Sequence, residues 1–242
     1  MKNILFIAHD DPGQEARLQC ALDVVRAVGG HLNCLSIAVP PIMTGVAESG
    51  YVAALAMDQV VETEQANHAR LEPRLVAEGV PYSWTEATGG LLGAIETYGL
   101  LNDLIVTGSH GPERTRDQFD VAGEIVKRAG RPVLAVPHQA RSIDFGGCAL
   151  VAWDGSKPAD AALRGAVPLL RLAERVVVAG VDDDLRLTLD EAATYCSRQG
   201  IRSEVEVLPH GFDHIPRTLQ QYAKGIGADW IVMGAYGHSK LR

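Results

Sequence analysis

The 242-residue sequence lacks the features that define several common protein classes. It contains only 5% aromatic residues and four scattered cysteines, Cys20, Cys34, Cys148 and Cys196, with no C-x-x-C pair. This spacing does not fit a disulfide-stapled secreted scaffold or a redox motif, so we interpret all four as structural. No apolar run approaches the roughly 18 residues that a membrane-spanning helix needs.

The sequence is also short of basic residues. Lys and Arg total 22 against 30 Asp and Glu, which gives a net charge of −8 and a pI near 5.5. This balance argues against a protein whose main task is to bind nucleic-acid phosphates. Asp10 and Asp11 follow too closely on the N-terminus for a secretion signal. We therefore expect a cytoplasmic protein with neither a membrane nor a nucleic acid as its partner.

What the sequence does contain is an alternation of short β-branched runs and longer helical patterns. In the first part we expect strands at 3–9, 31–39, 81–87, 102–108 and 132–137 and helices at 15–28, 58–78, 91–98 and 120–129. Segment 44–56 is rich in Gly and Ala and predicts either a loop or a short helix. In the second part we expect strands at 147–153, 175–181, 202–208 and 228–234 and helices at 158–172, 188–198 and 213–224. Such alternation predicts parallel β-α-β crossovers and open, Rossmann-like α/β sheets.

The second part repeats the first. Residues 102–111 and 228–237 both read x-D-x-I-V-x-G-x-x-G, and a repeat of this size indicates a domain duplication. We expect two domains, 1–140 and 146–242, joined by the polar, turn-rich linker 139–146.

The two domains differ in their predicted ends. By analogy with the first, we expect the second to continue past Arg242 with a helix and a strand, in roughly 25–30 residues that form a disordered tail or have been cut away. Within the given sequence the second domain therefore lacks its last helix and strand.

Glycines follow the repeated strand in both domains. They let the backbone approach a ligand closely, so that consecutive N–H groups can bind phosphate oxygens. In an open α/β sheet, ligands bind beyond the carboxyl ends of the strands, where the strand order reverses. Three strand ends of the second domain should meet there: 152–154, 181–182 and 233–237. We expect a ligand site at this edge.

The sequence resembles the universal stress protein family in its five strands per unit and in the strand ends V-x-G-S-H-G and V-M-G-A-Y-G, with the A-G-R-P-V-L-A-V-P ending of the first domain and the W-D-G-S start of the second. The resemblance covers nearly the whole chain and is to the tandem two-domain members. It implies two units of the universal-stress or HUP-like type that pack as an intramolecular pseudo-dimer, and it leaves a homodimer open.

The resemblance also implies a cofactor, because members that bind ATP carry G-x2-G-x9-G-[S/T] after the fourth strand and an aspartate after the first. Carried onto this sequence, it implies that Asp154 contacts the ribose or the adenine edge. Ala152 and Val181 would lie near the adenine. Lining the nucleotide and beginning the phosphate loop would be Met233, Gly234, Tyr236 and Gly237. The implied ligand is ATP, with or without Mg²⁺, or another adenine nucleotide.

The first domain departs from this pattern. Val121 and Ala122 stand where the family has Gly-Ser or Gly-Thr, Asp117 and Asp120 add negative charge to the loop, and His9 precedes Asp10. We therefore expect the first domain not to bind a nucleotide. In the second domain the final Gly-[S/T] would fall after Arg242.

Four other features have two interpretations each. His210 and His214 have a metal-like spacing, but Asp213 between them suits a helix cap, and no further ligands are evident. The run Asp182–Asp184 suits a cation or a solvated turn. His110 and His238 suit solvated turns or, for His238, a phosphate contact. Ser156 lacks a paired base and predicts a helix N-cap.

The function that these observations predict is that of a cytosolic stress-response protein that binds an adenine nucleotide in its second domain. It would act as a binding or signalling module, with a protein partner of unknown identity, and not as an enzyme, because no catalytic group is evident. The alternatives are a nucleotide-free interaction scaffold and a slow ATPase.

Overall fold

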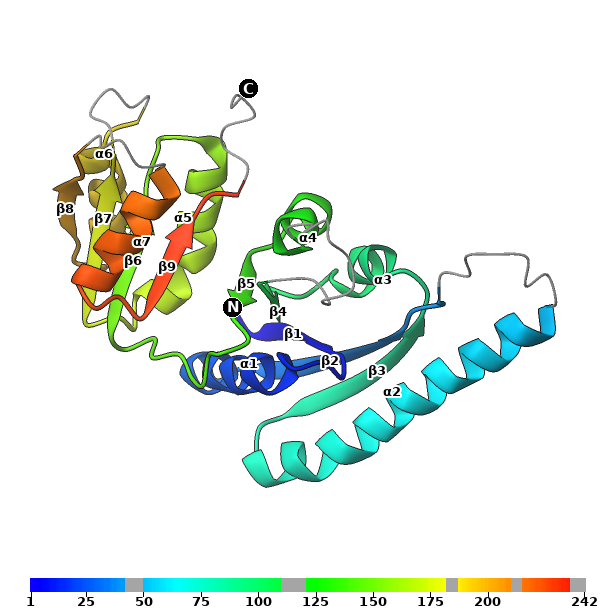
Figure 1. Cartoon of the computed structure of the whole chain (residues 1–242). Coiled ribbons are helices and arrows are strands. Elements are labelled where there is room, and N and C mark those ends of the chain that lie inside the picture. The colour runs from blue at the N-terminus through cyan, green and yellow to red at the C-terminus, as the bar shows by residue number, and fades with distance from the viewer. Residues whose placement is uncertain (42–49, 110–120, 182–186, 210–214, 236–242) are drawn as a thin grey trace. The chain divides into compact units, whose positions relative to one another are not determined.

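The border between two structural units falls inside the predicted linker. The computed structural model describes residues 1–41, 50–109, 121–181, 187–209 and 215–235. It divides the chain into unit 1, Met1–Ser142, and unit 2, Ile143–Arg242. Each unit is built on one parallel sheet (Figure 1), which confirms the predicted fold class of two tandem open α/β units. Within the described residues, no helix has the length and apolarity to span a membrane.

Unit 1 contains a five-stranded sheet in the order β3-β2-β1-β4-β5. Its strands are β1 (Asn3–Ala8), β2 (His31–Ala38), β3 (Tyr82–Thr88), β4 (Leu104–Gly108) and β5 (Val133–Val136). Its helices are α1 (Gln14–Val28), α2 (Gly50–Glu78), α3 (Leu91–Tyr98) and α4 (Val121–Ala129). The chain runs outward from β1 to β3 and then returns to the other side of β1, so the strand order reverses between β1 and β4.

Unit 2 repeats this plan with a four-stranded sheet among its described residues, in the order β8-β7-β6-β9. The strands are β6 (Cys148–Ala152), β7 (Arg175–Gly180), β8 (Glu204–Val207) and β9 (Trp230–Met233). The helices are α5 (Lys157–Leu170), α6 (Leu189–Arg198) and α7 (Ile215–Gly225). Here the strand order reverses between β6 and β9.

Helix α2 is longer than predicted. It begins at Gly50 and not near residue 58, so residues 50–56 of the Gly- and Ala-rich segment continue the predicted helix, and the rest of that segment, 44–49, lies outside the described residues. Residues 52–55, V-A-A-L, are all apolar and all exposed, so this turn shows no alternation of apolar and polar positions from which a helix could be predicted. Figure 1 shows this cyan helix running along β3.

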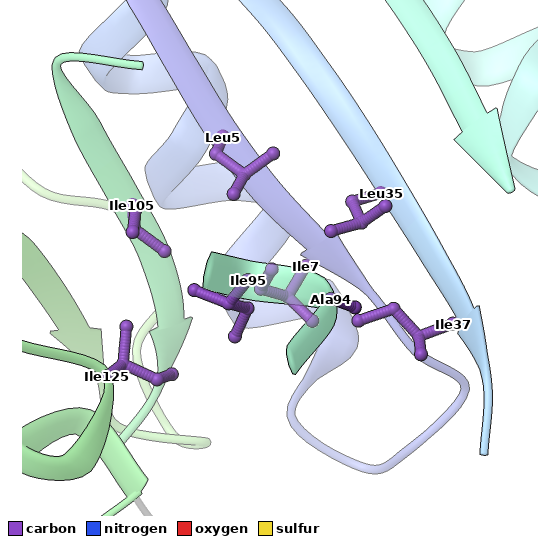
Figure 2. Close-up of a cluster of buried hydrophobic side chains, with 8 residues drawn as sticks. All are labelled: Leu5, Ile7, Leu35, Ile37, Ala94, Ile95, Ile105 and Ile125. Atoms are coloured by element: carbon purple, nitrogen blue, oxygen red, sulfur yellow. The ribbon is translucent and has the colours of Figure 1, made fainter. Parts of the chain in front are cut away.

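The core of unit 1 forms where two helices cover one face of the sheet. Figure 2 shows Ala94 and Ile95 of α3 and Ile125 of α4 beside β1, β2 and β4. The buried members of this cluster are Leu5, Ile7, Leu35, Ile37, Ala94, Ile95, Ile105 and Ile125. Full burial of an aliphatic side chain contributes about 1.5–3 kcal/mol, so this cluster is a main source of the stability of unit 1.

Unit 2 has a smaller cluster on the corresponding face. Leu150, Val177 and Ala179 of the sheet lie under Ala223 of α7, and Leu208 completes the buried set. Leu219, Tyr222 and Ile226 pack around it and are partly exposed. The cluster therefore covers β6 and β7 and leaves the face of β9 outside it.

Candidate functional site

The carboxyl edge of the unit 2 sheet brings together the residues predicted from its three strand ends. Ala152 lies at the end of β6 and is paired with Ala179 of β7 on one side and with Met233 of β9 on the other. The backbone N–H of Trp153 extends the ladder by donating to the carbonyl of Ala179 at 2.8 Å. Val181 directly follows β7 and is partly exposed. This edge includes the point where the strand order reverses, the usual place for a ligand in an open α/β sheet.

Asp154 stands at the centre of this edge, in the turn from β6 into α5. Its carboxylate accepts a hydrogen bond from the N–H of Ser156 at 3.0 Å, and the Ser156 hydroxyl in turn accepts from the N–H of Ala159 at 3.2 Å. Ser156 is thus the N-cap of α5, as predicted. The two hydrogen bonds fix the turn and hold the partly exposed Asp154 carboxylate at the edge of the sheet.

The glycine after β9 has a packing role of its own. A Cβ atom on Gly234 would lie 2.6 Å from the N of Ala159 and 2.8 Å from the C of Pro158, in the first turn of α5. Only glycine lets the end of β9 approach this helix so closely. Met233, just before it, is 54% exposed and available to a ligand. Tyr236 and Gly237, the remaining predicted site residues, lie outside the described residues.

Trp153 belongs to the core and not to the ligand edge. It follows β6 instead of lying within it, is 5% exposed, and donates its indole N–H to the carbonyl of Leu187 at 2.9 Å. A buried tryptophan whose N–H is satisfied by the backbone has a structural role.

The same edge of unit 1 can be compared residue by residue, because an aspartate fixes the register in both units. Asp103 accepts hydrogen bonds from the N–H groups of Lys2 at 2.5 Å and Asn3 at 3.0 Å, and Asp229 accepts from the N–H of Cys148 at 2.8 Å. The N–H of each aspartate donates back to the carbonyl of Asn3 or Cys148. The aspartate of the repeated x-D-x-I-V motif therefore joins the starts of two strands, a role that the sequence analysis missed.

Counted from this shared start, His9 falls at the register position of Asp154. His9 Nδ1 lies 3.0 Å from the Oε1 of Glu64 on α2. The hydrogen bond and charge of Glu64 raise the pKa of His9 above 6.5, against the opposing effect of burial. Where unit 2 presents a carboxylate at the edge of its sheet, unit 1 presents an imidazole that is already paired.

Unit 1 does have a carboxylate in this turn, that of Asp11, but an arginine side chain is paired with it. Asp11 accepts from the N–H of Gly13 at 2.6 Å, as Asp154 does from Ser156, and also from both terminal nitrogens of Arg17 at 2.8 Å. Arg17 is 5% exposed and donates as well to the carbonyl of His9 at 2.9 Å. Burial disfavours the charged form of Asp11, yet the Arg17 contacts outweigh it and the pKa of Asp11 is lowered. The turn of unit 1 is closed by a buried ion pair.

The other candidate residues add no chemistry to the described part of the molecule. Cys20 and Cys34 are buried, and burial raises the pKa of their thiols to about 11 and about 12. Within the described ranges, no group of three or more His, Cys, Asp or Glu side chains could hold a metal ion. Ala122 is buried in α4. His110, Asp117, Asp120, Asp182–Asp184, His210, Asp213, His214 and His238 lie outside the described residues.

The fold defines a class: two open α/β units in tandem, each with a reversal of strand order next to its central strand. No family model matches the sequence. A stretch of 164 residues, 64% of this chain, is 27% identical to the universal stress protein Slr1230 of Synechocystis sp. and covers 55% of that protein. The match thus spans about half the length of this curated relative.

Two solved structures match over both units. A universal stress protein from Archaeoglobus fulgidus has a TM-score of 0.69 at 17% identity, over 98% of this chain and 89% of its own. A Pseudomonas aeruginosa protein assigned to the universal stress proteins has a TM-score of 0.57 at 17% identity, over 100% of this chain and 84% of its own. The chain is a tandem of universal-stress-type units in its fold, and the predicted resemblance to the universal stress proteins is confirmed.

Proposed function

We propose that this protein binds ATP or another adenine nucleotide at the carboxyl edge of unit 2, with one site per chain, and acts as a cytoplasmic binding or signalling module in a stress response. The observation that carries the proposal is the placement of Asp154 at the reversal point between β6 and β9, with Ala152, Val181 and Met233 on the adjoining strand ends. The flat face of an adenine ring fits against such small and flexible side chains, and a carboxylate can accept hydrogen bonds from the hydroxyl groups of a ribose.

Each residue has a proposed role. Asp154 accepts hydrogen bonds from the ribose or from the adenine edge, since its position is already fixed by the turn into α5. Ala152 and Val181 leave room for the adenine ring, and Met233 packs against it. Gly234 begins the loop whose backbone N–H groups, with Tyr236 and Gly237, bind the phosphates. Mg²⁺, where present, is carried by the phosphate oxygens of ATP.

Unit 1 does not take part in nucleotide binding in this proposal. His9 is paired with Glu64, and Asp11 is paired with Arg17, so both polar side chains of the corresponding edge have partners within the unit. A nucleotide would have to displace the buried Arg17 from Asp11, which costs several kcal/mol.

The proposal is one of binding without turnover. Ser156, the hydroxyl nearest to Asp154 in the turn, is used as the N-cap of α5, and no histidine or carboxylate base is hydrogen-bonded to this hydroxyl among the described residues. Other universal stress proteins have been solved with cAMP and with AMP. Their likeness covers one unit at TM-scores of 0.41 and 0.37, so the present proposal rests on this chain's own residues.

Equilibrium dialysis of the full chain with ATP and with AMP tests the proposal. We expect about one nucleotide per chain, and we expect Asp154→Ala to weaken binding by about tenfold or more, because hydrogen bonds to a charged group contribute roughly 1.5–3 kcal/mol. Asp144→Ala is the matched control. Asp144 makes the same type of turn, accepting from the N–H of Gly146 at 2.8 Å, but it precedes β6 instead of following it.

Each other outcome has a defined meaning. Two nucleotides per chain would show that unit 1 binds as well. No binding of any adenine nucleotide would favour the interaction scaffold, in which Gly234 serves packing alone. ATP hydrolysis that falls in Asp154→Ala would favour the slow ATPase. If Asp154→Ala and Asp144→Ala weaken nucleotide binding equally, the cause would be disruption of their turns and not loss of a contact between Asp154 and the nucleotide.

A further inference from the structure

A chain of hydrogen-bonded groups connects α2 to the sheet of unit 1. The Ser36 hydroxyl of β2 donates to Glu64 Oε2 at 2.6 Å, and His9 Nδ1 lies 3.0 Å from Glu64 Oε1. The Glu64 side chain is only 8% exposed, whereas that of His9 is 44% exposed. A buried carboxylate therefore has, as its cationic partner, a group that can lose its charge near neutral pH.

We propose that His9 and Glu64 form a proton-controlled latch: protonated His9 holds the middle of α2 against the unit 1 sheet, and loss of that proton weakens the hold. A buried carboxylate is costly without a charged partner. When His9 is neutral, Glu64 keeps its hydrogen bond from Ser36 but no longer has an opposite charge in contact. Separation of α2 from the sheet then becomes easier because it lets water reach Glu64.

The position of Glu64 in α2 makes it suitable for this role. Among residues 52–78 of α2, the buried ones are Glu64, Asn67, Leu71 and Leu75, so Glu64 is the first buried residue of this range. The apolar contacts of Leu71 and Leu75 lie in the later turns. Weakening the contact at Glu64 therefore affects the turns before it, and leaves the C-terminal half packed.

The charges around the latch are otherwise balanced. Asp11 and Arg17 both face His9, but they are paired with each other, and Asp10 is paired with Arg70 of α2 at 2.6 Å. Glu86 of β3 lines the same small cavity as Ser36 and Glu64 and lies 3.3 Å from His68 of α2.

Two further contacts join α2 to unit 1 near the latch. The amides of Gln14 and Asn67 exchange two hydrogen bonds, of 2.8 Å and 2.9 Å, that are independent of pH. The His68 ring of α2 stacks on Trp84 of β3 with 4.0 Å between the ring centroids.

The direction of the pH effect follows from the raised pKa of His9. A histidine whose pKa is higher in the folded than in the unfolded state stabilises the fold fully below about pH 6.5, and this contribution is lost as the pH rises through the folded value. The latch is closed in acid and loosens toward alkaline pH. His9 stands at the register position that Asp154 has in unit 2. The position proposed for ligand binding in unit 2 would therefore respond to pH in unit 1.

Hydrogen exchange of the full chain at about pH 5.5 and about pH 8.5, corrected for intrinsic rates, tests the latch. We expect residues 52–66 of the wild type to lose roughly two- to fivefold of their protection at the higher pH, since a half-exposed ion pair contributes about 0.2–1 kcal/mol. His9→Gln and Glu64→Gln should remove this pH dependence. His31→Gln, which replaces a partly exposed histidine whose Nε2 lies 3.2 Å from the Ser83 hydroxyl, should leave it unchanged.

A wild-type pH dependence that persists in His9→Gln would overturn the proposal, as would protection of 52–66 that does not change with pH. If both glutamine variants fail to fold, the titration of the His9 ring by NMR decides. The proposal requires the amides of 60–66 to follow the His9 midpoint, and a different midpoint, or none, refutes it.

Discussion

Units 1 and 2 share a scaffold and differ in the turn after the central strand. In both, an aspartate of the repeated motif joins the starts of two strands, and a second aspartate shapes the turn into the first helix. In unit 1 that second aspartate forms an ion pair with Arg17. At the position of α5 that corresponds to Arg17, unit 2 has Asp160, which pairs with Arg164. The comparison teaches that a duplicated scaffold can keep its geometry while the ion pairs near the turn change.

The two units also differ in how the face of the repeated strand is covered. Ile105 and Thr107 of β4 are 0% and 5% exposed, while Ile231 and Met233, their counterparts in β9, are 41% and 54% exposed. In unit 1, α4 places Ile125 in the cluster with Ile105. The described cluster of unit 2 contains no residue of β9.

The largest effect should come from removing the ion pair that closes unit 1. Arg17→Met would leave the partly buried Asp11 without its counter-charge, and we expect unit 1 to lose about 3 kcal/mol of stability. Arg164→Met is the matched change in unit 2, where the pair with Asp160 is largely exposed and the loss should stay below about 1 kcal/mol. Urea unfolding followed by hydrogen exchange in peptides of each unit measures both. Equal losses in the two variants would contradict the expectation that the Arg17–Asp11 pair contributes more stability than the Arg164–Asp160 pair.

A smaller effect is expected at the glycine that follows β9. Gly234→Ala would push a Cβ into the first turn of α5, and overpacking of this kind costs about 1–3 kcal/mol. Gly225→Ala, at the end of α7 with no atom within 4 Å of the added Cβ, is the control and should be neutral or slightly stabilising. Thermal unfolding of the two variants gives the comparison. A neutral Gly234→Ala would mean that this glycine is present for a ligand and not for packing.

The smallest effect should separate the two motif aspartates. Asp103→Asn weakens two hydrogen bonds from backbone N–H groups, and Asp229→Asn weakens the one from Cys148, so we expect losses of about 1 kcal/mol and somewhat less. The hydrogen bonds from Asn3 and Lys2 lower the pKa of Asp103, so its stabilising contribution is lost as the pH falls through the folded-state value. Acid unfolding of the wild type and Asp103→Asn should therefore converge at low pH. Curves that stay parallel would assign Asp103 no such role.

Much of the fold could be predicted from the sequence, because buried parallel strands are continuous apolar runs that stand out between helical patterns. The five strands of unit 1 and the N-cap at Ser156 follow from residues close together in the chain. The start of α2 could not be predicted, since residues 52–55 are all apolar and all exposed and show no alternation of apolar and polar positions.

The candidate site divides in the same way. The sequence placed Ala152, Asp154, Val181, Met233 and Gly234 at strand ends, and the sheet order brings those strand ends to one edge. That His9 stands in the register of Asp154, and that the motif aspartates pair with β1 and β6, depends on hydrogen bonds between residues about a hundred positions apart.

By itself, then, the sequence determined the alternation of strands and helices, the duplication and the set of residues at the strand ends, because these depend on local periodicity and on motif spacing. Only the tertiary structure decided which charged side chains pair with one another. Asp11 meets Arg17, and Glu64 meets His9, through the folding of helices onto the sheet. A charge is neutralised by what lies next to it in space, and that neighbour is set by packing and not by distance along the chain.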